Sequence, residues 1–172
     1  MTNHGGKEEI VLLLEETMIC TIDNPLRLAD DPMRQSPRTL APLNPYCVVC
    51  GQMNPSGLHL EFEAMGGTSI AQWTASAGLE SFQGVIHGGV ICAVLDEAMS
   101  QAIISAGYSA LTAEIRVRFR NKVSVNDTLC VRGRMVGVRK RKIVAESSLA
   151  SADGVEGAHA WATFLATADS RV

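Results

Sequence analysis

One stretch combines residue types that could do chemistry: residues 84–99, GVIHGGVICAVLDEAM, set a histidine, two glycines and two adjacent acids in an otherwise apolar run. On a helix turning about 100° per residue, Asp96 falls at the border of the polar face, beside Cys92 and Met99. Partial burial there should make the carboxylate more basic, which suits a general base or nucleophile. Glu97 falls nearer the middle of the polar face, so we expect it to be solvated.

The glycines could supply the other half of a site. At a helix start, Gly88 and Gly89 would present unpaired N–H groups at the positive end of the helix dipole, where a carbonyl oxygen developing negative charge could bind. The alternative is that they only permit a tight turn into the helix. For His87 we expect a structural role at the helix start, with contact to a substrate as the alternative.

Hydrophobic periodicity predicts the elements that must position these residues. LHLEFEA and TSIAQWTA alternate apolar and polar residues around two glycines, which predicts a hairpin. A helix over about 89–106 follows, with Gly107 as its C-terminal cap. Four further strands are predicted at ALTAEIRVRF, TLCVRGRMVGV, KIVAESSLAS and VEGAHAWATFLA. This order predicts an α+β fold in which a curled antiparallel sheet of about six strands surrounds one long central helix.

Proline marks a boundary in the chain, because all six prolines lie between Pro25 and Pro55. We therefore expect residues 1–45 to form an N-terminal helix, over 7–20, and a proline-rich arm, and residues 46–172 to form the compact domain. No apolar run of about eighteen residues is free of charges, so neither a membrane span nor a secretory signal is expected. Five irregularly spaced cysteines indicate reduced thiols and a cytoplasmic location.

The charges are unevenly distributed. Residues 116–142 hold ten Lys or Arg and one acid, although the formal net charge of the chain is -3. Few aromatic residues interrupt this band, so we do not expect a nucleic-acid partner. Cys47 and Cys50 form one C-x-x-C, but a zinc site would need further ligands from His59, Cys92 or Cys130, so no metal is expected.

The stretch around Gly88 and Asp96 and the strands that follow it resemble a known family. GVIHGGVICAVLDEAM, followed by LTAEIRVRFR, is similar to the hot-dog fold acyl-CoA thioesterases of the phenylacetate-pathway and 4-hydroxybenzoyl-CoA thioesterase group. CVVCGQMNPSGLHLEF is similar to the opening of many bacterial members. The resemblance covers about residues 46–166 and implies hydrolysis of an acyl-CoA thioester to a carboxylic acid and free coenzyme A, without a cofactor.

The resemblance also implies roles for individual residues. Asp96 matches the catalytic acid, acting as general base or nucleophile, and the Gly88 amide matches the donor that polarises the thioester carbonyl. Ser100 matches a hydroxyl that helps to hold the nucleophile or water. Ser81 departs from the pattern, because relatives of the phenylacetate type have Asn or Gln there; Gln83 could take over that role.

Coenzyme A carries a diphosphate and a 3′-phosphate, and alternating arginines would face one side of a strand. The candidate substrate-binding residues are therefore His87, Gly89, Arg116, Arg118, Arg120 and Arg141. A solvated strand face is the alternative for the basic band. The rival function is a non-catalytic acyl-CoA binding or regulatory module, and a hydratase is a third candidate that lacks a recognisable Asp and His pairing.

The separation between Gly88 and Asp96 along the helix predicts that two chains assemble into a dimer. Gly88 and Asp96 are eight residues apart, which separates them by about 12 Å along a helix. One thioester carbonyl can hardly contact both in a single chain, whereas two antiparallel helices related by a two-fold axis would bring each Gly88 beside the partner's Asp96. We expect a homodimer, and the resemblance implies that dimers often pair into a homotetramer.

Overall fold

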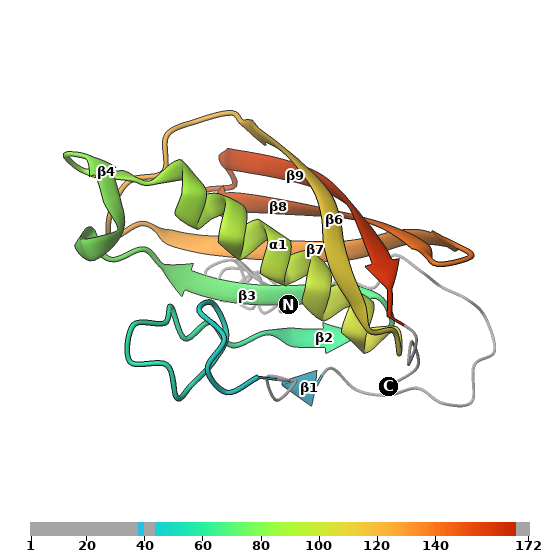
Figure 1. The fold of residues 1–172 in the computed structure, drawn as a ribbon. Helices are drawn as coiled ribbons and strands as arrows, with labels where there is room; N and C mark the ends of the chain where they lie inside the picture. Colours follow the sequence, from blue (N-terminus) through green and yellow to red (C-terminus); the bar gives the residue numbers. More distant parts are fainter. Residues whose placement is uncertain (1–37, 40–43, 168–172) are drawn as a thin grey trace, which may run out of the picture.

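An antiparallel sheet curves around one long helix (Figure 1). The computed structural model describes residues 38–39 and 44–167 of the chain. The described sheet has seven strands in the order β1-β2-β3-β7-β8-β9-β6. Their bounds are β1 Arg38–Thr39, β2 Glu63–Met65, β3 Thr68–Thr74, β6 Ala110–Phe119, β7 Thr128–Arg139, β8 Lys142–Ser151 and β9 Glu156–Ala166.

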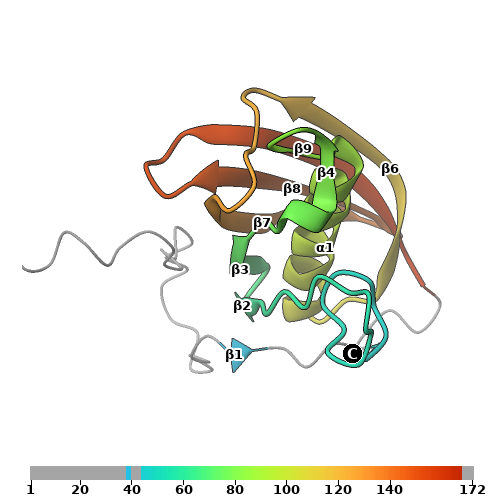
Figure 2. The same ribbon diagram turned by 90° about the vertical axis from the view of Figure 1, so that its left-hand side faces the viewer.

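The helix α1, Gly88–Ser105, lies on the concave face of this sheet, which wraps around it from β2 to β6 (Figure 2). A 3-10 turn, Ala77–Leu79, and a small hairpin of β4, Glu80–Phe82, and β5, Val85–Ile86, lead into the helix. Gly107 follows the helix with φ 81°, and its N–H donates to the Ile104 carbonyl at 2.8 Å. This is the predicted glycine cap, since a positive φ costs glycine little.

A close crossing fixes the height of α1 above the sheet. A Cβ at Gly133 of β7 would lie 2.1 Å from the Ala98 carbonyl oxygen, so only glycine lets the helix approach this strand. The Ser69 hydroxyl of β3 donates to the same oxygen at 2.6 Å. Eight helix residues are buried: Ile91, Val94, Leu95, Ala98, Met99, Gln101, Ala102 and Ile103.

The helix is long and apolar enough, by length and composition alone, to cross a membrane, but the buried core helix of a soluble protein meets the same test. Here α1 packs against strands β3, β6, β7, β8 and β9. The strands around it fully bury Leu95, Met99 and Ile103, the largest apolar side chains of the helix core.

The predicted fold class is confirmed: one long helix packs on a large antiparallel sheet. The last four strands lie where the sequence predicts them, within one residue at each end. The first predicted strand is wrong over residues 58–62. His59 has φ 53°, outside the β region, and the Leu58 and Leu60 N–H groups donate to Val48 and Val49 carbonyls in the preceding loop.

The sequence also predicts an N-terminal helix and reduced cysteines. The predicted helix over residues 7–20 lies outside the described residues, as does most of the proline-rich arm. Among the described cysteines, Cys47, Cys50 and Cys92 are free thiols, whereas Cys130 is disulfide-bonded. The expectation of uniformly reduced cysteines is therefore wrong at Cys130.

Candidate active site

The start of α1 is capped by a histidine. Nδ1 of His87 accepts a hydrogen bond from the Gly89 N–H at 2.9 Å, so His87 satisfies one of the N–H groups that a helix leaves unpaired. The ring is exposed, which leaves its other edge open to a ligand. The structural role expected for His87 is thus present, and the Gly89 N–H is already engaged.

The N–H of Gly88, at the start of the helix, is not capped by His87. Within the described chain, no hydrogen bond uses the Gly88 N–H. A Cβ on Gly88 would lie 3.2 Å from the Phe119 ring of β6, which is tighter than ordinary van der Waals contact. The close approach of β6 therefore explains glycine at this position, and the backbone donor points from the positive end of a helix of eighteen residues.

Asp96, in the third turn of α1, is half-buried and faces strand β6. The Thr112 hydroxyl donates to Asp96 Oδ1 at 2.8 Å. Burial raises the pKa of the Asp96 carboxyl, the hydrogen bond from Thr112 opposes this, and the neighbouring Glu97 carboxylate raises it further. The result is a carboxylate held in one orientation and made more basic than an exposed aspartate, as a general base or nucleophile requires.

Thr112 was not among the residues singled out from the sequence. It lies sixteen positions after Asp96 on a different element, and a bulge between Thr112 and Glu114 interrupts the pairing of β6 with β9 at this point. A threonine in a strand is common, so no local sequence signal distinguishes this one.

Glu97 turns away from Asp96 toward the loop that precedes β2. Its Oε1 accepts from Gln101 Nε2 at 2.7 Å, and its Oε2 accepts from Cys47 Sγ at 3.6 Å. Burial, followed by the nearby Glu97 carboxylate, raises the pKa of the Cys50 thiol well above its usual range. The expected solvated position for Glu97 is therefore wrong, because a loop distant in sequence covers this side of the helix.

The remaining predicted polar residues lie around the helix without joining Asp96. Ser100 is half-buried one turn beyond Asp96. Gln83 is exposed in the turn between β4 and β5. No hydrogen bond in the described part of the chain connects Gln83 or Ser100 to Gly88 or Asp96.

Two of the four predicted arginines lie on the face of the sheet that points away from α1. Arg116 and Arg118 of β6 pair with Trp161 and His159 of β9, and they alternate with Ile115 and Val117, which pack against the core. Within one chain the two guanidinium groups therefore point away from the side of β6 that meets α1.

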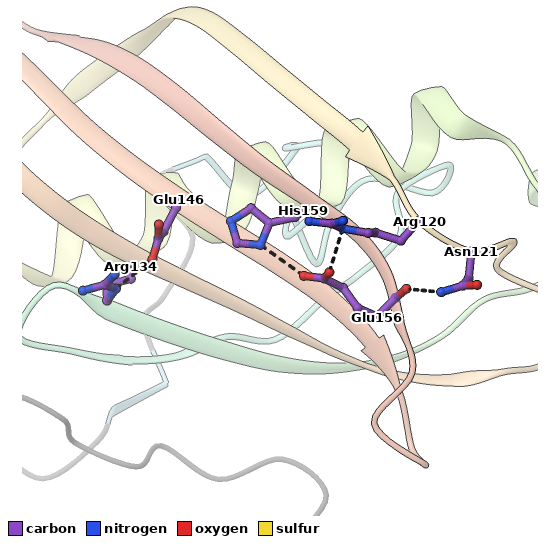
Figure 3. Close-up of polar contacts among 6 residues, drawn as sticks. All are labelled: Arg120, Asn121, Arg134, Glu146, Glu156 and His159. Atoms are coloured by element: carbon purple, nitrogen blue, oxygen red, sulfur yellow. Dashed lines mark hydrogen bonds and ion pairs between the residues drawn. The ribbon is translucent and has the colours of Figure 1, made fainter.

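The other two predicted arginines have partners within the chain. Arg120 Nε is 3.1 Å from Glu156 Oε2, and the other oxygen of that carboxylate is 3.1 Å from His159 Nδ1 (Figure 3). Arg141, in the β7–β8 turn, donates through Nε and Nη2 to the Ala166 carbonyl. Arg116 and Arg118 have no such partner among the described residues, which leaves them the freer cations.

Comparison with known proteins shows which family pattern and which fold this chain is similar to. The model of the thioesterase superfamily matches residues 83–158, which include α1 and strand β6. No curated protein sequence shows significant similarity to the chain.

Many solved structures share the fold. A thioesterase superfamily protein has TM-score 0.68 and 23% identity; the alignment covers 70% of this chain and 60% of that one, so this chain spans well under two thirds of that relative. A hypothetical thioesterase from Streptococcus pneumoniae TIGR4, solved with coenzyme A, has TM-score 0.61 and 18% identity over 63% of this chain and 85% of that one. The E. coli PaaI protein of the phenylacetic acid degradation operon has TM-score 0.59 and 18% identity over 64% and 80%.

The Streptococcus pneumoniae protein has also been solved as two alanine variants, one replacing an aspartate and the other a threonine sixteen positions later. Identities this low establish a shared fold. With the family match over residues 83–158, they confirm the predicted resemblance: this chain has the hot-dog fold and carries the sequence pattern of the thioesterase superfamily.

Proposed function

We propose that this protein is an acyl-CoA thioesterase in which Asp96 attacks the thioester carbonyl or activates water to do so. The observation that carries the proposal is the Asp96 carboxyl, half-buried and oriented by the Thr112 hydroxyl at 2.8 Å. The same sixteen-residue spacing of aspartate and threonine was chosen for substitution in the Streptococcus pneumoniae thioesterase.

The free N–H of Gly88 supports the second half of the mechanism. A helix N-terminus stabilises the oxyanion that forms on the carbonyl during attack, and its contribution grows as water is excluded. Attack at the carbonyl carbon gives a tetrahedral intermediate, and collapse of that intermediate expels the coenzyme A thiolate. If Asp96 is the general base, the attacking water gives it the proton that the thiolate later takes up. If Asp96 is the nucleophile, collapse leaves a mixed anhydride, which water hydrolyses to the carboxylic acid and the free Asp96 carboxylate.

A second chain completes the proposed site. Gly88 and Asp96 both lie on α1, about 12 Å apart along the axis, so one carbonyl cannot contact both in a single chain. Among the described strands, β6 lies at the edge of the sheet, and it exposes Leu111 and Phe119. Edge-to-edge pairing of two sheets there would cover the unpaired strand and set two α1 helices antiparallel.

The rival proposal is a non-catalytic module that binds acyl-CoA at the same site. A desolvated carboxylate beside a thioester favours catalysis, because a protein that only binds gains nothing from burying that charge. The test is release of free thiol from a panel of short, medium, long and aromatic acyl-CoAs by the purified full chain. Thiol release above the Asp96→Asn background supports hydrolysis, whereas measurable binding without release from any member would support the module.

A further inference from the structure

The structure gathers three potential metal ligands outside the proposed active site. Cys47 and Cys50 lie in the loop before β2, and Glu97 lies on α1, about fifty residues away in sequence. One sulfur from each cysteine and one carboxylate oxygen all lie within 4.8 Å of one another. Cys50 is buried, and the other two residues are half-buried.

The spacing of these atoms fits a tetrahedral metal. With zinc bonds of about 2.3 Å to sulfur and about 2.0 Å to oxygen, tetrahedral geometry requires a sulfur-to-oxygen separation of about 3.5 Å and a sulfur-to-sulfur separation of about 3.8 Å. Cys47 Sγ and Glu97 Oε2 are 3.6 Å apart. A cation at the centre would replace the thiol proton that Cys47 now shares with the carboxylate.

Hydrogen-bond donors point at all three ligands. The Val49 N–H donates to Cys47 Sγ at 3.4 Å. Gln101, a buried side chain on α1, donates through Nε2 to Glu97 Oε1 at 2.7 Å and lies 3.7 Å from Cys50 Sγ. Donors of this kind stabilise thiolates and carboxylates, and in metal sites they fix the orientation of the ligands.

The loop is shaped to present both sulfurs to the helix. A Cβ on Gly51 would lie 2.4 Å from the Cys47 nitrogen, and the Gly51 N–H donates to the Cys47 carbonyl at 3.0 Å, so the chain turns tightly directly after Cys50. His59, which could have been a ligand, instead places Nδ1 3.0 Å from the Gly51 carbonyl oxygen. The third ligand therefore comes from Glu97 on the helix, which no ligand spacing in the sequence connects with Cys47 and Cys50.

We propose that Cys47, Cys50 and Glu97 bind a thiophilic divalent cation, with Zn²⁺ as the best match, and that the ion fastens the loop before β2 to the core helix. Two thiolates select a soft or borderline metal, and one carboxylate is compatible with zinc. Three protein ligands leave a fourth tetrahedral position for water. This proposal does not depend on the proposed thioesterase activity.

Metal binding by the full chain tests the proposal. The protein is reduced, freed of metal with a chelator, and titrated with Zn²⁺ against a chromophoric competitor under anaerobic conditions. We expect about one Zn²⁺ per chain, a thiolate-to-cobalt charge-transfer band when Co²⁺ replaces Zn²⁺, and a higher melting temperature with metal, since a ligand that binds only the folded state stabilises it.

Variants locate the site. Cys47→Ser and Cys50→Ser should each abolish the cobalt–thiolate band or halve it and weaken Zn²⁺ binding, and Gln101→Leu should weaken binding by about 10- to 100-fold. Cys92→Ser is the matched control, because Cys92 is another half-buried free thiol on α1 that lies outside the cluster. Circular dichroism confirms that each variant is folded.

Two results would overturn the proposal. In the first, the reduced wild-type chain binds Zn²⁺ no better than a Cys47→Ser, Cys50→Ser double variant. In the second, Cys92→Ser removes the metal as effectively as the cluster variants. A Cys47–Cys50 disulfide that forms in air, in a chain that takes up no metal when reduced, would identify the pair as a redox couple instead.

Discussion

Asp96 and Glu97 are adjacent acids on one helix, yet their surroundings give them different chemistry. Asp96 faces β6, where Thr112 donates to it, and Glu97 faces the loop before β2, where it meets Cys47. A rotation of about 100° per residue separates the two side chains. The role of each carboxylate therefore depends on the element that packs against it rather than on its being an acid.

We expect Asp96→Asn to keep the fold and to lower kcat for acyl-CoA hydrolysis by about 10²- to 10⁴-fold, because an amide preserves shape but cannot accept a proton or attack a carbonyl. Steady-state thiol release checks this. Glu61→Gln is the control, since it makes the same change at an exposed carboxylate outside the site. An equal loss from Glu97→Gln would contradict the assignment of the reacting carboxylate to Asp96.

The pKa of Asp96 predicts a pH dependence. The carboxylate must be ionised to react, and burial raises its pKa, so activity should fall on the acidic side at a pH above the usual aspartate range. The Thr112 hydroxyl stabilises the ionised form. Thr112→Val should therefore move the acidic limb of the kcat/KM profile to higher pH.

Thr112→Ser is the matched control, because it keeps the donor and should leave that limb near its wild-type position. A profile that does not move in Thr112→Val would mean that Thr112 does not act on the ionisation of Asp96.

The sequence predicts residues best where the signal is local. The helical wheel places Asp96 at the edge of the apolar face, and the two glycines mark the helix start, because both patterns depend on neighbours within a few turns. Thr112 and the Cys47–Glu97 contact depend on tertiary packing across sixteen and fifty residues, and no periodicity encodes that. The candidate site could therefore be found, but its orienting partner could not.

Among the helices and strands, the sequence predicts the long strands in which apolar and polar residues alternate strictly, but it does not predict the irregular segments. Strands β6 and β8 lie where the pattern places them. In residues 58–62 the apolar side chains are more buried than the polar ones, as predicted, but Leu58 and Leu60 donate to backbone carbonyls of the preceding loop rather than to a strand. The sequence does not predict the β4–β5 hairpin, because strands of only two or three residues show no measurable periodicity.

Strand β6 also carries the basic residues offered to coenzyme A. Arg118 is exposed and, as the freer cation, is the clearest test: Arg118→Gln should raise KM for acyl-CoA by up to about fivefold and change kcat less, since a phosphate contact far from the thioester stabilises ground and transition states alike. The effect should shrink at high salt.

Arg134→Gln is the matched control, because Arg134 is on β7, which is separated from β6 by β8 and β9, and pairs with Glu146 within the chain (Figure 3). An acyl thioester that lacks the nucleotide should not distinguish Arg118→Gln from wild type. Equal effects on both substrates would show that Arg118 is not a phosphate ligand.

At the scale of the whole molecule, a single chain leaves two features incomplete. In the described part of the chain, strand β6 pairs on one side only, and it exposes Leu111 at 70% and Phe119 at 52%. The two halves of the proposed site, Gly88 and Asp96, lie too far apart on α1 for one carbonyl. Pairing of two chains along β6 would complete both features. It would cover the edge strand, and it would bring each Gly88 close to the partner's Asp96.

Mixing two inactive variants tests the shared site. Asp96→Asn removes the reacting carboxylate, and Gly88→Pro removes the backbone donor while keeping a residue that is tolerated at the first position of a helix. Each variant is first shown to fold and to exchange subunits with its partner. In a hybrid dimer with shared sites, one site carries both lesions and the other carries neither, so activity should return to at most half of the wild-type value per hybrid. If both groups act within a single chain, every site in the hybrid carries one lesion, and the mixture should stay as inactive as its parents.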